Sequence, residues 1–485
     1  MKISHTILTC AACIALSSAE AFGLDVANTM PGALKSNVGD QAATVTTLKV
    51  TGPVNAVDFE FICHDMPALR TLDLSGATVT VYKGAKLLSG RFESDAHVLP
   101  EFAFIGSGVT SVTLPATLTA IGDGAFSASK ITNVTIPATV TTIGESAFSD
   151  CAALTSITIP ASVTSIGQGA FNKCTALTSA AVNGAVADIP ARAFAGCSAL
   201  AAVTVPSSLK TIGEEAFAQT GLTGIDLTGC TSLETVGKWA FAGCDKLQNV
   251  IMPASVPALS EGAFFHNTSL ESGLGAMQGS NAAVPDYAYT GNEKMTADGF
   301  GDTSVSTIGN YAMQGLSGVS VINLPATLES LGDKAMANMS GLTKIKADGL
   351  SAVPAVGQDV WDGVAQGDVE LGVHENMADA FRNADQWRDF AVKIITTGID
   401  EVGADDTAAS GVKGRFSGHE LIVSSLSADI TGIQLYDVAG RMYLLPARQV
   451  TRTLLTFDAS AIDDGIYVVR VMLADGTASA LKLRK

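Results

Sequence analysis

Hydrophobic residues recur along most of the chain in a phrase that repeats every 22 to 25 residues. The phrase consists of an Ile-Pro step, a Val or Leu, an Ile-Gly step and an Ala-Phe pair, as in 136–148 and 159–171. We call each copy a rung and its final large residue the anchor. Twelve anchors keep this step: Phe104, Phe126, Phe148, Phe171, Phe194, Phe217, Phe241, Phe264, Tyr289, Met313, Met336 and Trp361. A fixed period of this length is typical of solenoids, in which each repeat packs on its neighbours.

Each rung predicts a short strand that proline ends, a turn at the Ile-Gly step and a short helical turn that carries the anchor. In 157–159 the Ile-Thr-Ile alternation buries both isoleucines and exposes Thr158. Pro160 ends the strand because proline has no N–H to donate to a ladder. We expect the glycine of the Ile-Gly step to supply backbone angles that other residues resist. The predicted fold is a repeat solenoid with parallel β strands on one face and short helical turns at the anchors, spaced by about 4.8 Å per rung.

One rung carries the whole repeat motif, Leu154-x-x-Ile157-x-Ile159-Pro160 followed by Ile166-Gly167-x-x-Ala170-Phe171-x-x-Cys174. This motif resembles the BspA-like leucine-rich repeat, which is common on surface proteins of anaerobic Gram-negative bacteria. The resemblance covers about residues 98–395. It implies a cell-surface adhesin whose partner is a host or bacterial surface protein or a glycan. Glycines replace the strand pattern over about 272–305, where we expect a loop or kink.

Segments at both ends of the repeat have the pattern of caps that cover the terminal cores of a stack. Residues 22–97 predict an N-terminal cap and the first leucine-rich turns. Residues 375–391 carry apolar residues at helical spacing and predict an amphipathic closing helix. Within it we expect Trp387 in the core, and the alternative is an exposed aromatic residue that binds ligand.

Residues 1–21 have the pattern of a secretory signal peptide. Lys2 precedes an apolar stretch, 7–16, that is too short to span a bilayer, and Ala19-Glu20-Ala21 offers a small-x-small cleavage site. The alternative is a buried N-terminal helix. No later segment has the apolar length of a membrane helix. We therefore expect an exported protein, at the cell surface or outer membrane or secreted, and not a helical membrane protein.

The last part of the chain predicts a linker and a small second domain. Residues 396–415 are rich in glycine and acidic residues and predict a flexible linker. Alternating segments within 416–485 predict an antiparallel β-sandwich. Three segments carry a further resemblance: Ile433-x-Leu435-Tyr436-Asp437-x-x-Gly440-Arg441, 464–471, and Lys482-Leu483-Arg484-Lys485. They resemble the C-terminal sorting domain of the type IX secretion system, which implies the secretion machinery as a partner. The alternative is a stabilising or spacing domain.

Charge and motif content narrow the classes of function. Twenty-nine basic and 47 acidic residues give a net charge of −18, which repels phosphate backbones and disfavours nucleic acid as a partner. The sequence contains no His-Glu-x-x-His zinc pair, no Gly-x-Ser-x-Gly elbow and no phosphate-binding loop. We expect no catalytic residue, no metal ligand and no cofactor. A hydrolase with an unrecognised site, using a group such as Asp286 or His266, is the less favoured alternative.

The exposed position of the strands provides the candidate ligand-binding residues, Thr113, Thr135, Thr158 and Thr204. We expect these hydroxyl groups to form a flat polar surface for a protein or a glycan. One alternative is that threonine stands there for its β-propensity alone. Ice binding is another, and a structural or spacing envelope protein without a dedicated ligand is the alternative function.

Four cysteines follow a phenylalanine anchor by three residues, at Cys151, Cys174, Cys197 and Cys244. This common offset places them in one column of the stack. Side chains that point in parallel are poorly oriented for a disulfide, so we expect buried free thiols. Disulfides between adjacent rungs and a metal site are the alternatives.

Overall fold

The computed structural model describes residues 22–84, 87, 93–253, 258–271, 283–296, 305–394 and most of 412–484. Within the last range it does not describe 418–419, 426–428, 438–440, 444–446, 451–453, 461, 464–465 and 475–477. The predicted signal peptide, most of the predicted linker and most of the segment 272–305 lie outside the described residues. The chain divides into two compact units, Met1–Leu270 and Glu271–Lys485, which we describe one at a time.

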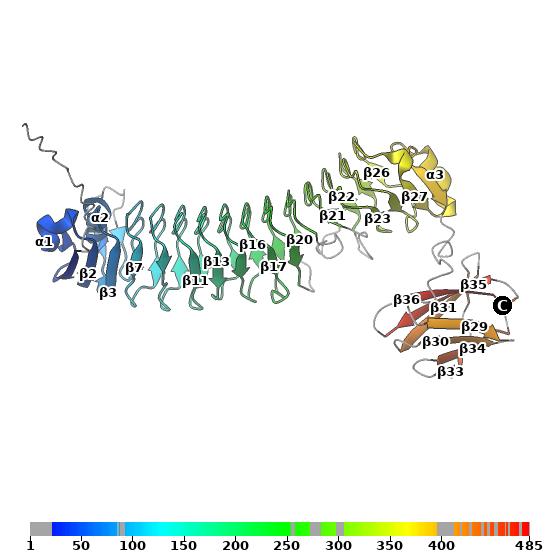
Figure 1. The fold of residues 1–485 in the computed structure, drawn as a ribbon, viewed down its shortest axis with the longest axis horizontal. Helices are drawn as coiled ribbons and strands as arrows, with labels where there is room; N and C mark the ends of the chain where they lie inside the picture. The colour runs from blue at the N-terminus through cyan, green and yellow to red at the C-terminus, as the bar shows by residue number, and fades with distance from the viewer. Residues whose placement is uncertain are drawn as a thin grey trace, which may run out of the picture. The chain divides into compact units, whose positions relative to one another are not determined.

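The N-terminal end of the first unit is a cap of helices and parallel strands (Figure 1). Its elements are β1 (Gly23–Ala27), α1 (Leu34–Val38), η1 (Gly39–Ala43), β2 (Thr47–Val54), α2 (Ala56–Asp65), β3 (Thr71–Val79), β4 (Tyr82–Lys83) and β5 (Glu93–Ser94). The buried carboxylate of Asp58 accepts the backbone N–H groups of Gly32 at 2.7 Å, Leu34 at 2.9 Å and Asn55 at 2.9 Å. One side chain thus caps α2 and holds the segment before α1 against it.

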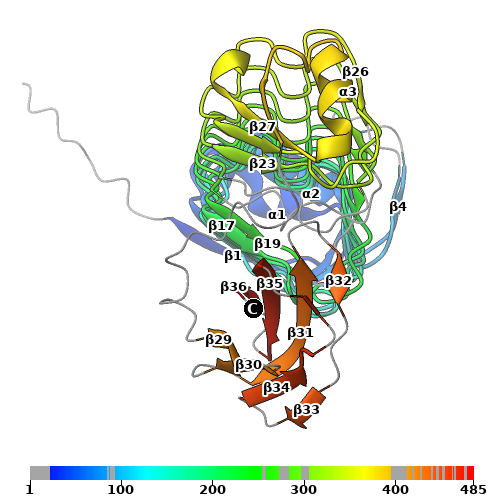
Figure 2. The ribbon, with the colours of Figure 1, turned by 90° about the vertical axis from the view of Figure 1, so that its right-hand side faces the viewer.

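Two series of strands follow along the first unit, and members of each series pair in parallel. The first series is β7 (Ser111–Thr113), β9 (Asn133–Val134), β11 (Ser156–Ile159), β13 (Ser179–Val182), β15 (Ala202–Thr204), β17 (Gly224–Asp226) and β19 (Asn249–Ile251). The second is β6 (Val98–Leu99), β8 (Ala120–Ile121), β10 (Thr142–Ile143), β12 (Ser165–Ile166), β14 (Asp188–Ile189), β16 (Thr211–Ile212), β18 (Thr235–Val236) and β20 (Ala258–Leu259). Pairing keeps equivalent residues opposite each other, as with Ile143 and Ile166. Equivalent positions therefore form columns, and the solenoid prediction is confirmed (Figure 2).

The anchors of the first unit form a continuous column of stacked rings. From Phe104 to Phe264, neighbouring ring centroids lie 4.9 to 5.5 Å apart, and no pair of ring planes differs by more than 23°. All eight rings are buried. Phe59 of α2 covers the first ring edge-on at 5.6 Å. The column is the core of the unit, and its spacing follows the spacing of the rungs.

The anchors lie in runs of consecutive turns, where we had expected short helical turns. Two residues before and two residues after each anchor the backbone is left-handed, as at Ser146 (φ 52°) and Asp150 (φ 59°) around Phe148. The N–H of Phe148 donates to the carbonyl of Ala170 in the next rung at 2.7 Å, and its two left-handed neighbours donate in the same direction. A helix keeps its N–H groups within the segment. The alternating backbone instead directs every second N–H along the stack.

The glycine of the Ile-Gly step is required by the close approach of adjacent rungs. A Cβ added to Gly167 would lie 2.3 Å from the backbone nitrogen of Glu145, and one added to Gly144 would lie 2.6 Å from that of Asp123. Neither glycine has a positive φ. The expectation that these glycines supply unusual backbone angles is therefore wrong, and the absence of a side chain is what matters.

The second unit contains further rungs with their own strands, followed by a closing segment and then by the C-terminal domain. The strands are β21 (Ala283–Val284), β22 (Thr307–Ile308), β23 (Val321–Asn323), β24 (Ser330–Leu331), β25 (Lys344–Lys346), β26 (Ala355–Val356), β27 (Glu370–Val373) and β28 (Ala391–Ile394). The closing segment contains η3 (Gln366–Asp368), η4 (Glu375–Met377) and α3 (Ala378–Asn383). The part of the predicted irregular segment that is described, 283–296, has the strand and anchor turn of an ordinary rung.

The predicted closing helix, 375–391, is wrong in extent, because α3 ends at Asn383 and Ala391 begins β28. The chain leaves the helix so that Gln386 can hydrogen-bond the backbone of the last rung, accepting from the N–H of Val360 and donating to the carbonyl of Gly357. Trp387 is fully buried, as expected, and its ring meets that of Trp361 at 5.1 Å. The closing segment is thus a cap built from short pieces.

The C-terminal domain consists of two four-stranded antiparallel sheets, as predicted. One contains β29 (Val412–Ser417), β30 (Glu420–Ser425), β34 (Leu454–Asp458) and β33 (Ala447–Val450); the other contains β32 (Met442–Tyr443), β31 (Ile430–Asp437), β35 (Ile466–Leu473) and β36 (Ala478–Arg484). Val412 is fully buried in the core with Leu421 and Val469. The first strand therefore begins inside the predicted linker, 396–415, whose C-terminal boundary is wrong by a few residues.

The cysteine column lies in the core of the first unit, and its thiols bond the anchors. The Sγ of Cys174 donates to the carbonyl of Phe148, one rung earlier, at 3.1 Å, and the other three columnar cysteines make the equivalent bond. All six cysteines of the described residues are free, so the prediction of buried free thiols is confirmed. Burial raises the pKa of Cys244 to about 11, which keeps it protonated at neutral pH.

We expect Phe171→Ala to lower the free energy of unfolding by about 3–5 kcal/mol, because it opens a cavity in the middle of the ring column. Urea unfolding followed by circular dichroism measures the loss. Thr158→Ala, on the exposed side of the neighbouring strand, is the control and should change stability by no more than about 0.5 kcal/mol. If Phe171→Ala lowered the free energy of unfolding by less than about 1 kcal/mol, the stacked rings would not be a main source of the stability of the solenoid.

We expect Ellman's reagent at pH 8 to modify Cys63, which is partly exposed, and to leave the five buried thiols unmodified until the chain unfolds. Both restricted access and, at Cys244, the raised pKa oppose their reaction. Thiol release is measured with and without urea. Rapid release from several thiols in the native protein would contradict the buried column.

Candidate functional site

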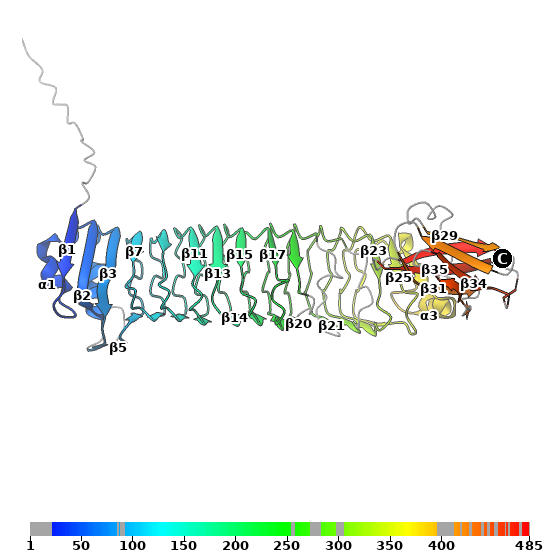
Figure 3. The ribbon, with the colours of Figure 1, turned by 90° about the horizontal axis from the view of Figure 1, so that it is seen from below.

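The four predicted ligand-binding threonines are exposed, as the alternation predicted. Figure 3 shows the first strand series, to which they belong or adjoin, running along the first unit. Thr158 and Thr204 flank Ala181 in adjacent paired strands, and Thr113 lies opposite Asp73. Thr135 follows β9 directly. We call Thr113, Thr135, Thr158 and Thr204 the threonine face.

The hydroxyl groups of this region divide into two kinds. Next to the threonine face, the hydroxyls of Thr132, Thr155 and Thr178 each donate to the backbone carbonyl of the preceding rung, at 3.0 to 3.3 Å. Among the described residues, the structure gives the hydroxyls of the threonine face no hydrogen-bond partner. The flanking hydroxyls therefore serve the stack, whereas those of the threonine face are available to a ligand.

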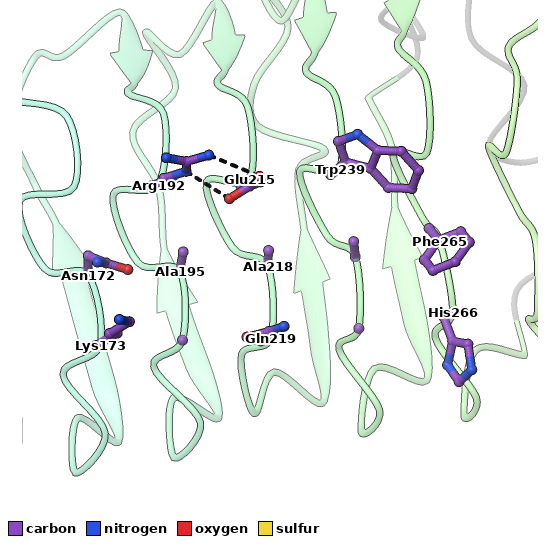
Figure 4. Close-up of a pocket in the computed structure, with 13 residues that line it drawn as sticks. Asn172, Lys173, Arg192, Ala195, Glu215, Ala218, Gln219, Trp239, Phe265 and His266 are labelled. Carbon is purple, nitrogen blue, oxygen red and sulfur yellow. Dashed lines mark hydrogen bonds and ion pairs between the residues drawn. The ribbon is translucent and has the colours of Figure 1, made fainter.

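A second surface, which sequence analysis missed, is a groove of about 710 Å³ along the anchor turns of five consecutive rungs (Figure 4). Its floor is formed by the small residues that directly follow three anchors, Ala195, Ala218 and Ala242. Its wall is formed by the residues two positions before the same anchors, Arg192, Glu215 and Trp239. Asn172 and Lys173 lie at one end, and Phe265 and His266 lie at the other. We call this surface the anchor groove.

The wall exists because the position two residues before the anchor carries a large side chain in three consecutive rungs, between rungs in which it is small. In the preceding rungs the same position holds Gly124, Ser146 and Gly169. At the far end the indole of Trp239 lies across Gly262, where an added Cβ would come within 2.2 Å of the ring. The ring of Phe265 meets the indole edge-on at 5.1 Å. Glycine at 262 thus makes room for the indole.

The charged side chains that line the anchor groove include one bidentate ion pair. The guanidinium of Arg192 donates through Nε at 2.8 Å and through Nη2 at 3.2 Å to the two carboxylate oxygens of Glu215. This hydrogen bonding raises the pKa of Arg192, which is charged at any accessible pH. With Lys173, the groove lining carries one more basic than acidic side chain. It differs in this respect from the chain as a whole, whose net charge is −18.

The two residues named for the alternative of a hydrolase, Asp286 and His266, belong to different units of the chain. Asp286 belongs to the second unit, where its carboxylate accepts the backbone N–H of Asn310 at 2.7 Å and the side-chain amide at 3.1 Å. In the next two rungs, the side chain of Asn310 accepts the backbone N–H of Asp333, and the carboxylate of Asp333 accepts that of Gln358. This ladder gives Asp286 a structural role. His266 belongs to the first unit and is an exposed lining residue of the anchor groove.

Searches for other kinds of site cover only the described part of the chain. There, no group of three or more His, Cys, Asp or Glu side chains is arranged to hold a metal ion. In the same residues, no helix has both the length and the apolar character needed to cross a membrane.

Comparison with protein families finds a match to the BspA type leucine rich repeat region, in six copies. The matches cover residues 97–223, 171–296 and 282–359, which together make up more than half of the chain. A search of curated proteins returned no match.

Solved structures that resemble this chain include leucine-rich repeat proteins. A leucine-rich repeat protein from Bacteroides ovatus is 18% identical, covers 77% of this chain and 92% of its own, and superposes with a TM-score of 0.51. A leucine rich cell surface protein from Faecalibacterium prausnitzii is 20% identical over 64% of this chain and 86% of its own, with a TM-score of 0.38. The pneumococcal vaccine antigen PcpA is 14% identical over 72% and 79%, with a TM-score of 0.32. The first of these supports the fold, and neither the family nor these structures indicate a catalytic family.

We expect Gly262→Ala to destabilise the protein more than Gly169→Ala does. Both glycines have a left-handed backbone, φ 61° and 62°, so both variants carry the cost of an L side chain there, about 1–2 kcal/mol. Only at 262 does the new methyl meet the indole of Trp239, whereas at 169 the nearest atom is 3.5 Å away. Urea unfolding and the tryptophan emission maximum measure the difference. Equal losses and an unchanged emission spectrum would show that the indole does not lie on Gly262.

Proposed function

Because the chain belongs to the family of BspA-type leucine-rich repeat proteins, we propose that it is a non-enzymatic, exported cell-surface adhesin. Its ligand is a protein or a glycan on a host cell or another bacterium, and the threonine face is the surface that binds it. The family match supports a repeat protein of this type. The signal-peptide pattern of residues 1–21 supports export.

The observation that carries the proposal is the state of the hydroxyl groups on the threonine face. Each hydroxyl both donates and accepts, and the structure leaves these four without a partner among the described residues. Below them the strands are held in register by the ladder and by buried residues such as Ile157 and Ile159. A rigid surface of this kind binds without ordering its own side chains, which lowers the entropy cost of association. Affinity then comes from many small contacts across rungs.

We propose that the C-terminal domain, 412–485, is the part of the chain that the type IX secretion machinery recognises for export. Its resemblance to the sorting domain rests partly on the segment around Asp437. There the buried carboxylate of Asp437 accepts from Nε of Arg441 at 2.7 Å and from the hydroxyl of Tyr443 at 3.0 Å. These bonds hold the end of β31 against β32, so the motif residues shape this edge of the domain.

We expect the combined change Thr135→Glu, Thr158→Glu and Thr204→Glu to abolish saturable binding to a ligand found in a panel of matrix proteins, mucins and polysaccharides. Three carboxylates replace hydroxyls at the centre of the contact and impose desolvation and repulsion there. Surface plasmon resonance with the purified protein measures binding, and circular dichroism confirms the fold.

The control for this experiment adds the same charge to the same part of the stack on a different strand series. It changes to Glu three exposed threonines that directly precede β8, β10 and β12, namely Thr119, Thr141 and Thr164. Their hydroxyls each donate to a backbone carbonyl of the preceding rung, so circular dichroism must show that the control is folded as well. Binding should survive in the control. If the variant with Glu at positions 135, 158 and 204 also binds, the threonine face is not the binding surface. If the wild-type protein binds no member of the panel, a structural or spacing role is favoured.

A further inference from the structure

We infer that the anchor groove is a binding site for an extended oligosaccharide of pyranose units. The inference uses none of the residues of the threonine face, so it stands or falls separately from the function proposed above. It rests on the spacing of the rungs, on the side chains that line the groove and on the rigidity of its floor.

The spacing of the groove favours a sugar chain over an extended peptide. Successive rungs from Phe171 to Phe264 are 5.2 to 5.5 Å apart, as measured between their ring centroids. An extended peptide advances about 3.3 Å per residue and presents a side chain to the same face about every 6.6 Å, which is out of step with the rungs. A pyranose unit in an extended chain advances by roughly one rung. Each sugar would therefore meet the same kind of surface as the one before it.

The side chains of the groove have the chemistry that pyranose rings require. An indole provides a flat apolar surface for the C–H face of a sugar, and Trp239 lies at the wall of the groove with the ring of Phe265 nearly perpendicular to it at 5.1 Å. Hydroxyl pairs on a sugar need planar groups that donate and accept side by side. Arg192 and Glu215 provide them, and Asn172 and Gln219 add amides.

The polar groups are held in place before a ligand arrives. The bidentate bond fixes the planes of the Arg192 guanidinium and the Glu215 carboxylate. The guanidinium N–H groups that take no part in this bond therefore keep a fixed direction. Beneath them, the N–H of Phe194 donates to the carbonyl of Ala216 and that of Gln219 donates to the carbonyl of Ala242, both at 2.8 Å. The alanine floor therefore belongs to the rigid stack, and its small side chains let a sugar ring approach closely.

The charge of the groove extends the range of sugars that it accepts. Its small excess of basic side chains reduces, at this place, the repulsion that a chain of net charge −18 exerts on acidic ligands. Neutral sugars need only the stacking and hydrogen-bonding groups. Uronic acids would also pair with Lys173, so comparison of the two kinds of sugar tests the charge directly.

Intrinsic fluorescence reports binding at this site, because only one tryptophan is open to contact with a ligand or with iodide, while the buried ones contribute a constant emission. The chain has three tryptophans, and two of them, Trp361 and Trp387, are 2% and 0% exposed. Trp239 is partly exposed at the groove. A ligand that stacks on its indole would change its emission and protect it from quenching by iodide.

The experiment titrates the full chain with three hexasaccharides: β-1,4-linked glucose, β-1,4-linked xylose and α-1,4-linked galacturonate. We expect a saturable change in fluorescence with at least one of them, and calorimetry to give the same affinity. Trp239→Ala should weaken that affinity about tenfold or more, and Glu215→Gln should weaken it less, because it loosens the pair but keeps the indole. Calorimetry follows binding in Trp239→Ala, and urea unfolding shows that each variant is folded.

Two control variants separate this site from other effects. Tyr311→Ala removes an aromatic side chain at the equivalent position of a rung outside the groove, where it stacks on Tyr287 at 4.9 Å, and should leave affinity unchanged. The triple threonine variant described above should also bind the hexasaccharide normally. Unchanged affinity in folded Trp239→Ala, or no saturable signal with any of the three hexasaccharides, would overturn the inference, whatever the threonine face binds.

Discussion

The hydrogen bonds from each anchor turn to the next rung are the interaction on which the rest of the structure depends. A rung of about 23 residues has no core of its own. Because alternate residues of the anchor turn are left-handed, their N–H groups point along the stack and meet the carbonyls of the following rung. This contact fixes the distance between rungs, and the distance in turn brings the phenylalanine rings into a stacked column. It also brings the backbones so close that a Cβ added at Gly144 or Gly167 would meet the backbone of the preceding rung.

A stack of this kind must be closed at its ends, because its first and last rungs have partners on one side only. The N-terminal cap solves this with Phe59, which covers the first ring, and with the buried carboxylate of Asp58, which ties the cap together. In the second unit, Gln386 bonds the backbone of the last rung and Trp387 covers its anchor. Both caps use a side chain to satisfy backbone groups and an aromatic ring to cover the core.

The same constraint leaves the outward positions free to vary, and the candidate functions lie there. The threonine face and the anchor groove occupy different positions of the repeat, and neither includes an anchor residue. Any outward position recurs once per rung, so a binding surface can be assembled from residues about 23 positions apart without changing the stack. This separation lets the structure offer a flat hydroxyl surface at one position and a groove with an aromatic wall at another.

The period of the anchors by itself determined the solenoid, the parallel strands and the exposure of Thr158, because these follow from hydrophobic spacing that every rung repeats. Offset from the anchor likewise predicted the buried free thiols. Only the tertiary structure decided the conformation of the anchor turns and the reason for Gly167, since both depend on how close two rungs approach. It also decided where α3 ends, because a contact of Gln386 with a distant rung overrides local helical spacing. The anchor groove has no signal within any one rung: Arg192, Glu215 and Trp239 form a wall only when stacking places them side by side.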